Sequence, residues 1–145
     1  MPPSPPKCRR IADRTRVSVA FHHVDMMQIV HNTQYFKWFE AGRLGILDRF
    51  IPVDYAMENG LAVPVVMNTC EYYAPARYGD SLIVTTTHLV QPRWTGRFCF
   101  EHSISNAKTK IELCRGKSDV TVMSADAGRV LKVLPEGLWE RYTAI

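Results

Sequence analysis

Hydrophobic and polar residues alternate over residues 16–21. Val17, Val19 and Phe21 fall on one face, and polar or small residues fall on the other. A period of two is typical of a strand with one buried face. We therefore predict a strand that runs to about residue 23.

Residues 32–50 follow a different period. Apolar positions recur there at steps of three and four, as on one face of an α-helix, at Tyr35, Phe39, Gly42, Ile46 and Phe50. Either Asn32 or Thr33 can supply the N-cap. Because large aromatic residues lie on more than one side, we expect a helix of about 16 to 18 residues that other elements surround.

The rest of the chain has β character. Segments rich in β-branched and aromatic residues cover 61–74, 81–91, 96–105 and 111–125, with turn-forming residues between them. Residues 51–60 are predicted as a loop and 136–142 as a short helix. This order predicts an α+β domain in which a curved antiparallel sheet wraps one long helix. Because such a small sheet leaves open edges, we expect a homo-oligomer.

The composition fits one domain. The chain has 145 residues, of which 46% are hydrophobic and 22% charged, as in ordinary globular proteins. We predict a short disordered arm over 1–12, rich in proline, and a single domain over 13–145. No apolar run approaches the roughly 18 to 20 residues that span a bilayer, and the N-terminus lacks the apolar middle of a signal peptide. We therefore expect a cytoplasmic protein with no membrane partner.

Charge and cysteines limit the partners. The formal net charge of +4 is mild, and it suits either general surface charge or an anionic small-molecule ligand. Without a dense Lys/Arg run, nucleic acid is not an expected partner. The four cysteines form no close pair, so neither a zinc knuckle nor a redox motif is indicated. Cys99 and Cys114 lie in apolar strand patterns, which predicts buried thiols.

The stretch "VDMMQIVHN" places one carboxylate, Asp25, among apolar residues just before the predicted helix. Such surroundings would partly desolvate the carboxylate and make its anion more reactive. From the residues alone two interpretations stay open. Asp25 either satisfies loop amides or serves as a nucleophile or general base.

Three segments together resemble one family. "FHHVDMMQIVHNTQYFKWFEAGR" resembles a signature of strand, Asp, short loop, Asn and Tyr, followed by a helix with Glu, here Asp25, Asn32, Tyr35 and Glu40. "EYYAPARYGDSLIV" is similar to that family's aromatic-x-x-Pro-x-x-x-Gly-Asp turn, and "DAGRVLKVLP" to its closing hairpin. Over roughly residues 13–140 the chain resembles the hotdog-fold thioesterases of the 4-hydroxybenzoyl-CoA thioesterase-like family.

The resemblance implies a hotdog fold and hydrolysis of acyl-CoA at a site between two subunits of a homodimer or homotetramer. Asp25 would be the nucleophile or general base, and the backbone amide of Asn32 would stabilise the oxyanion. No metal or redox cofactor is implied, and CoA enters only as part of the substrate. One departure is Gln28, where the family usually has glycine. Either the turn differs, or the Gln28 side chain contacts the substrate.

Other polar residues near this stretch are candidates for the functional site, and each could have a purely structural role instead. His31 either orients the substrate or serves as an acid/base group, or it is structural. His22 and His23 point to opposite faces of a strand, so no shared metal ion is expected. Tyr35 either packs or lines an acyl pocket. Glu40 is expected to pair with an arginine one helical turn away, at position 43.

The phosphates of CoA favour Arg and Lys at loop ends. The candidates are Arg77, Arg93, Arg97, Arg115 and Lys117. Two other functions stay open. A hotdog dehydratase or hydratase would use His31 with Glu40, and a non-catalytic acyl-CoA or acyl-carrier binding protein is suggested by Gln28. The acyl group cannot be identified from the sequence.

Overall fold

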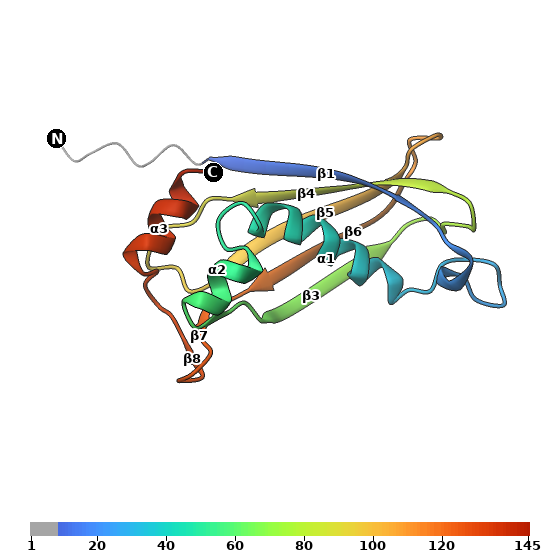
Figure 1. The fold of residues 1–145 in the computed structure, drawn as a ribbon. Helices are drawn as coiled ribbons and strands as arrows, with labels where there is room; N and C mark the ends of the chain where they lie inside the picture. Colours follow the sequence, from blue (N-terminus) through green and yellow to red (C-terminus); the bar gives the residue numbers. More distant parts are fainter. Residues whose placement is uncertain (1–8) are drawn as a thin grey trace.

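The structure is a computed structural model that describes residues 9–145. Five strands form one antiparallel sheet in the order β1-β4-β5-β6-β3. They are β1 (Arg10–Ser18), β4 (Ser81–Leu89), β5 (Phe98–Asn106), β6 (Glu112–Val120) and β3 (Val65–Tyr72). The long helix α1 (Gln34–Leu47) crosses one face of this sheet (Figure 1). This arrangement confirms the predicted α+β architecture.

Shorter elements occupy the ends of the sheet. A second sheet has the order β2-β7-β8. The short elements are η1 (Phe21–His23), α2 (Val53–Glu58), β2 (Leu61–Ala62), β7 (Met123–Ser124), β8 (Arg129–Val130) and α3 (Glu136–Thr143). Helix α2 falls in the segment that was predicted as a loop, and six residues are too few for a clear helical period. No helix in residues 9–145 combines the length and apolar character needed to cross a membrane.

The first strand lies earlier than predicted. It pairs along its whole length with β4, from Arg10 opposite Leu89 to Ser18 opposite Ser81. The predicted disordered arm over 1–12 is therefore wrong for residues 10–12, while residues 1–8 lie outside the described part. The strand also ends at Ser18, because the chain turns into the 3-10 helix η1 instead of continuing to residue 23.

Helix α1 buries the predicted face. Tyr35, Phe39, Gly42 and Ile46 are all buried against the sheet. The close approach depends on two glycines. A Cβ at Gly42 would overlap the hydroxyl of Thr86, and a Cβ at Gly116 would overlap the Phe39 ring.

A row of polar side chains lies under α1. Arg43 Nη1 donates to Ser118 Oγ at 3.1 Å, and the Ser118 hydroxyl donates to Asn68 Oδ1 at 2.7 Å. His102 Nε2 lies 2.9 Å from the same Oγ, and its Nδ1 lies 3.0 Å from Thr86 Oγ1. Since the Ser118 proton is directed to Asn68, His102 donates through Nε2 and accepts the Thr86 hydroxyl at Nδ1.

Arg43 was expected to form an ion pair with Glu40, but it contacts Ser118 in this polar row instead. Glu40 is exposed, and no ion pair joins it to Arg43 in the described residues. The two predicted buried thiols also differ. Cys114 is buried, but Cys99 is exposed because Phe98 and Phe100 take the inward positions of β5.

Candidate active site

A tight hairpin after η1 presents Asp25. Val24 pairs with Val30 across it, and the Asp25 N–H donates to the Ile29 carbonyl at 3.0 Å. The Gln28 N–H donates to the Asp25 carbonyl at 2.9 Å, which closes the turn. These bonds fix the backbone on both sides of the carboxylate.

Gln28 occupies the left-handed region that glycine favours. Its φ is +63°, as expected for the last residue of a turn that ends in a bulge. The glutamine therefore keeps the backbone conformation that a glycine would take most easily. The departure from the family pattern leaves the turn intact.

The carboxylate of Asp25 is partly held and partly free. Its Oδ1 accepts the Met27 N–H at 2.8 Å, and Oδ2 has no hydrogen-bond partner among residues 9–145. Of the apolar neighbours expected to desolvate this carboxylate, the two methionines do not do so in a single chain, although Asp25 itself is half-buried. Met26 is 100% exposed and Met27 is 73% exposed, because both side chains point outward from the tip of the hairpin.

The "PARYGD" turn anchors this hairpin. The Val30 N–H donates to the Ala76 carbonyl at 2.9 Å, and Ile29 bridges to Arg77. The turn itself is fixed by Asp80, whose Oδ2 accepts the Arg77 N–H at 2.9 Å. The "PARYGD" segment thus holds the Asp25 hairpin beside the start of β4.

Asn32 lies just before α1. The N-cap is Thr33, but its side chain forms no capping hydrogen bond. The His31 carbonyl accepts the Gln34 N–H at 3.0 Å, and the Asn32 carbonyl accepts the Tyr72 hydroxyl at 2.6 Å. No hydrogen bond engages the N–H of Asn32 within the described chain, so this donor is available to a ligand.

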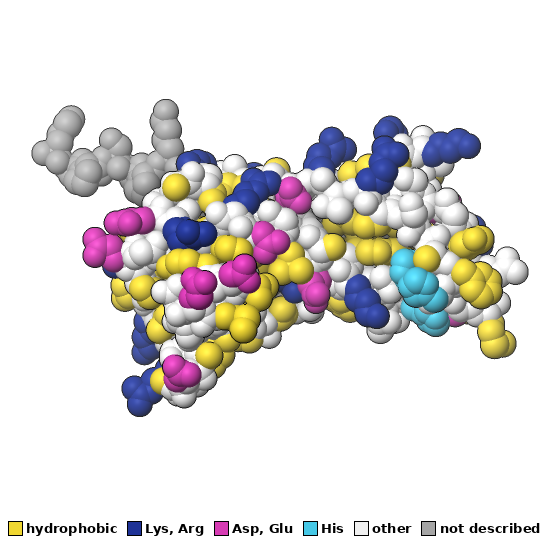
Figure 2. All heavy atoms as spheres, viewed as in Figure 1, with side chains coloured by type: hydrophobic (Ala, Val, Ile, Leu, Met, Phe, Trp, Pro, Cys, Tyr) yellow, Lys and Arg dark blue, Asp and Glu magenta, His cyan; other side chains and the backbone are white. Residues whose placement is uncertain are grey.

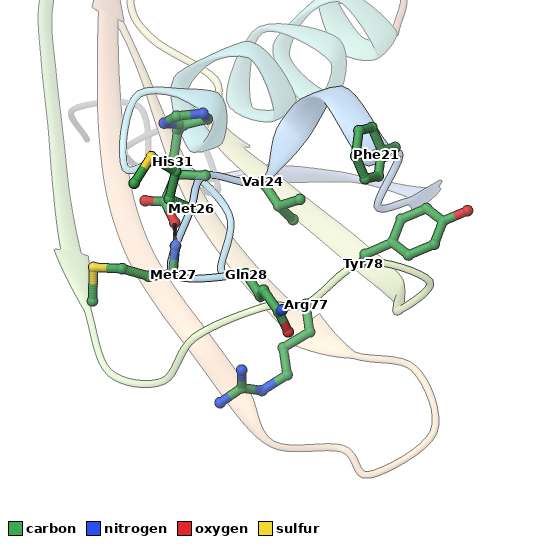
Figure 3. Close-up of a pocket in the computed structure, with 9 residues that line it drawn as sticks. Phe21, Val24, Met26, Met27, Gln28, His31, Arg77 and Tyr78 are labelled. Carbon is green, nitrogen blue, oxygen red and sulfur yellow. Dashed lines mark hydrogen bonds between the residues drawn. The ribbon is translucent and has the colours of Figure 1, made fainter.

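Two hollows meet at Asp25 and His31. The larger has a volume of about 1200 Å³ and also contacts Phe21, Met26, Arg77 and Tyr78. Figure 3 shows Met26 and Met27 on one side of it and Phe21 and Tyr78 on the other. The smaller, of about 430 Å³, also contacts Asn32, Tyr35 and Tyr72. Figure 2 shows hydrophobic and histidine side chains close together at this end of the molecule.

The histidines near the hairpin have different surroundings. His31 is exposed at both hollows. His23 Nδ1 accepts the Ala20 N–H at 2.9 Å, and its ring meets Trp38 edge-on. Desolvation, followed by the charges of His22 and Lys37, lowers the pKa of His23. No group of three or more His, Cys, Asp or Glu side chains in residues 9–145 is placed to hold a metal ion.

Tyr35 lies in the first turn of α1, where it is buried and borders the smaller hollow. Burial raises its pKa to about 12, although a hydrogen bond to the backbone of Ala76 opposes the shift. Its ring contacts Trp38 and Tyr72 edge-on, with centroids 5.3 and 5.2 Å away. Tyr35 therefore packs and also forms part of the wall of the smaller hollow.

The structure brings only some of the predicted CoA-binding residues to Asp25. Gln28 and Arg77 border the larger hollow. Arg93 and Arg97 belong to the connection between β4 and β5, which lies beside α3 at the end of the sheet away from η1 (Figure 1). There the Nε of Arg93 donates to the Leu134 carbonyl at 2.9 Å, and that of Arg97 donates to Asp119 at 2.7 Å.

Among the aromatic residues at the hollows, Phe21, Tyr72 and Tyr78 were not predicted from the sequence. Phe21 and Tyr78 face each other edge-on with centroids 5.9 Å apart. Phe21 was predicted to lie on the buried face of a strand, but that strand ends at Ser18 and Phe21 begins η1. Tyr72 and Tyr78 lie in the quoted turn segment, which was the available signal for them.

Known proteins resemble this chain in sequence and in structure. The sequence model of one protein family, the thioesterase-like superfamily, matches residues 19–141. A protein from Aquifex aeolicus (strain VF5), named as a proposed esterase, is 31% identical over 107 residues, which are 71% of this chain and 84% of that protein.

Two solved structures show the same fold. A 1,4-dihydroxy-2-naphthoyl-CoA thioesterase from Synechocystis superposes with a TM-score of 0.79 at 19% identity, over 92% of this chain and 97% of the other. A Staphylococcus aureus protein solved in complex with CoA superposes with a TM-score of 0.80 at 10% identity, over 93% of this chain and 84% of the other. These likenesses confirm the hotdog fold. Because the family model covers most of the chain, the protein belongs to the thioesterase-like superfamily.

Proposed function

We propose that this protein hydrolyses acyl-CoA thioesters with Asp25 as its catalytic carboxylate. One observation supports this most directly: two hollows meet at Asp25, beside the unpaired N–H of Asn32. A thioester carbonyl placed there would have a carboxylate for attack and an amide donor for the oxyanion. The CoA complex of the Staphylococcus aureus neighbour supports this class of ligand.

In the general-base route, Asp25 removes a proton from water while the water oxygen bonds to the thioester carbon. The negative charge then moves to the carbonyl oxygen, where the Asn32 N–H and the N-terminus of α1 stabilise it. The carbonyl then re-forms, the C–S bond breaks, and the leaving sulfur takes the proton from Asp25 to give free CoA thiol. In the nucleophilic route, Asp25 attacks the carbon directly, the C–S bond breaks and CoA leaves as its thiolate. Water then opens the resulting anhydride, which releases the acid and restores Asp25.

The larger hollow suits the CoA part of the substrate. Arg77 adds a cation at its rim, and the exposed Met26 and Phe21 add apolar surface. The aromatic walls of the smaller hollow, Tyr35 and Tyr72, suit the acyl group. We therefore assign CoA to the larger hollow and the acyl group to the smaller one.

A second copy of the chain is part of this proposal. In the described residues β3 pairs on one side only, with β6, and its exposed side chains include Val65, Val66 and Tyr72. Pairing along β3 would cover this apolar edge next to the smaller hollow. Sedimentation of the purified protein is expected to show a dimer or a dimer of dimers.

The deciding experiment is release of free thiol from a panel of acyl-CoAs. Asp25→Asn is expected to lower kcat by at least about 100-fold, whereas Asp48→Asn, an exposed aspartate after α1, keeps wild-type activity. Unchanged turnover in a folded Asp25→Asn variant would refute the role of Asp25. An acyl adduct on acid-quenched wild type would favour the nucleophilic route.

The structure gives less support to the alternatives. Glu40 contacts neither hollow, so a dehydratase pair of His31 with Glu40 is not assembled in one chain. Gln28 adopts the backbone conformation that glycine favours, so its presence gives less support to a non-catalytic protein. Hydration of an enoyl-CoA, or tight binding without turnover, would point to one of these two instead.

A further inference from the structure

Tyr72 joins the edge strand to the start of the long helix. It is the last residue of β3, and its hydroxyl donates to the Asn32 carbonyl at 2.6 Å. Its ring meets that of Tyr35 edge-on, with centroids 5.2 Å apart and planes at 78°. One side chain therefore contacts both the loop before α1 and the first turn of that helix.

With this hydrogen bond, the carbonyls on both sides of the Asn32 Cα are engaged. The carbonyl of His31 is engaged by the Gln34 N–H, and the carbonyl of Asn32 is engaged by Tyr72. Each peptide unit is planar, so holding the two carbonyls fixes both planes that meet at the Asn32 Cα. The Asn32 N–H shares its plane with the His31 carbonyl, so the bond from Gln34 sets its direction directly. Tyr72 holds the following plane and thereby limits rotation about the Asn32 Cα.

The hydroxyl of Tyr72 is suited to this purpose. Desolvation, followed by the neighbouring Cys70, raises the pKa of Tyr72 well above its usual value. The phenol therefore stays protonated, and stays a donor, throughout the neutral range. The edge-on contacts of Tyr35 with Trp38, and of Trp38 with His23, brace the same region from the other side.

We propose that Tyr72 is a positioning residue that holds the Asn32 amide as the oxyanion donor. This inference rests on the proposed thioesterase function. Tyr72 acts through the Asn32 backbone and touches no reacting atom. The Tyr72 ring borders the smaller hollow, but its hydroxyl is engaged by the Asn32 carbonyl. Loss of the hydroxyl alone therefore lowers the rate of the chemical step and leaves the contact of the ring with the acyl group in place.

The test compares Tyr72→Phe with Tyr55→Phe. Both remove one phenol hydroxyl, and Tyr55 lies in α2, where its ring packs under Arg141. Loss of one hydrogen bond is expected to lower kcat about three- to tenfold and to change KM less than about twofold. Tyr55→Phe is expected to match the wild type. An unchanged kcat in the folded Tyr72→Phe variant, or an effect on KM alone, would overturn the inference.

A second measurement does not depend on turnover. The backbone amide resonances of Asn32 and Thr33 are expected to move in Tyr72→Phe and not in Tyr55→Phe, and the Gln34 amide to exchange faster with solvent. If these amides are unaffected, Tyr72 does not position Asn32. If wild-type protein cleaves no acyl-CoA, the proposed function fails, while the resonances still decide whether Tyr72 holds this backbone.

Discussion

The N–H of Gln28 donates to the carbonyl of Asp25 at 2.9 Å, and this bond sets the turn from which the carboxylate projects. Gln28 closes it with φ at +63°. A side chain in this region costs about 1 to 2 kcal/mol. The chain therefore carries local backbone strain in the same turn as its candidate catalytic group.

Replacing Gln28 by glycine is expected to relieve this strain. Because glycine also loses more backbone entropy on folding, the net gain in free energy of unfolding should be about 0.5 to 1 kcal/mol, measured by urea denaturation. Gln28→Val, which is β-branched, is the matched control and should lower the free energy of unfolding. Thiol release by Gln28→Gly should stay near wild type. A large loss of activity would instead assign the Gln28 amide to the substrate.

The glycine in β6 under α1 gives a stability prediction. A Cβ at Gly116 would overlap the Phe39 ring and the Thr69 carbonyl, and a backbone carbonyl cannot turn aside. Gly116→Ala should lower the free energy of unfolding by about 1 to 3 kcal/mol. Gly137→Ala in α3 is the control, because its Cβ would come no closer than 3.5 Å to the Tyr55 hydroxyl. Equal stability of the two variants would contradict the packing argument.

The fold was predictable where burial is periodic. The spacing of Phe39 and Ile46 identified the buried face of α1, and both are fully buried. Burial of Arg43 was not predictable, because its partner Ser118 lies 75 residues away and local spacing suggested Glu40 instead. Cys99 was misassigned because an apolar strand pattern does not say which of its two faces is inward.

The site was predictable only in part, for the same reason. Asp25 and Asn32 were identified from a family signature that is contiguous in sequence. The bond from Tyr72 to Asn32 spans 40 residues and depends on how β3 ends beside α1. Likewise, the order of the strands places Arg77 beside Asp25 and Arg97 at the far end, which the spacing of arginines along a chain does not reveal.

This separation of Arg77 from Arg97 predicts different effects on binding. Arg77 borders the larger hollow, whereas Arg97 is paired with Asp119. Arg77→Ala should raise KM for an acyl-CoA about three- to tenfold with little change in kcat, and the effect should shrink at high salt. Arg97→Ala should change KM less than about twofold. The opposite ranking would mean that CoA reaches the far end of a neighbouring subunit.

The buried His102 predicts loss of stability in mild acid. Burial, followed by the charge of Arg43, lowers its pKa to about 3, whereas in the unfolded chain histidine titrates near 6.5. Below pH 6.5 the unfolded state therefore binds a proton that the folded state does not. The contribution of neutral His102 to the free energy of unfolding is fully present above pH 6.5 and is lost as the pH drops toward 3.

At pH 5 this linkage should cost about 2 kcal/mol relative to pH 7. His102→Gln removes the titrating group, so its free energy of unfolding should be lower at pH 7 but should fall by about 2 kcal/mol less than that of wild type on going to pH 5. Denaturant unfolding of both proteins at the two pH values measures the difference directly. The buried His88, whose pKa is also lowered by desolvation, is present in both proteins and cancels in the comparison. Equal pH dependence of the two proteins would show that His102 is protonated in the folded state, with Ser118 and Thr86 then arranged differently around it.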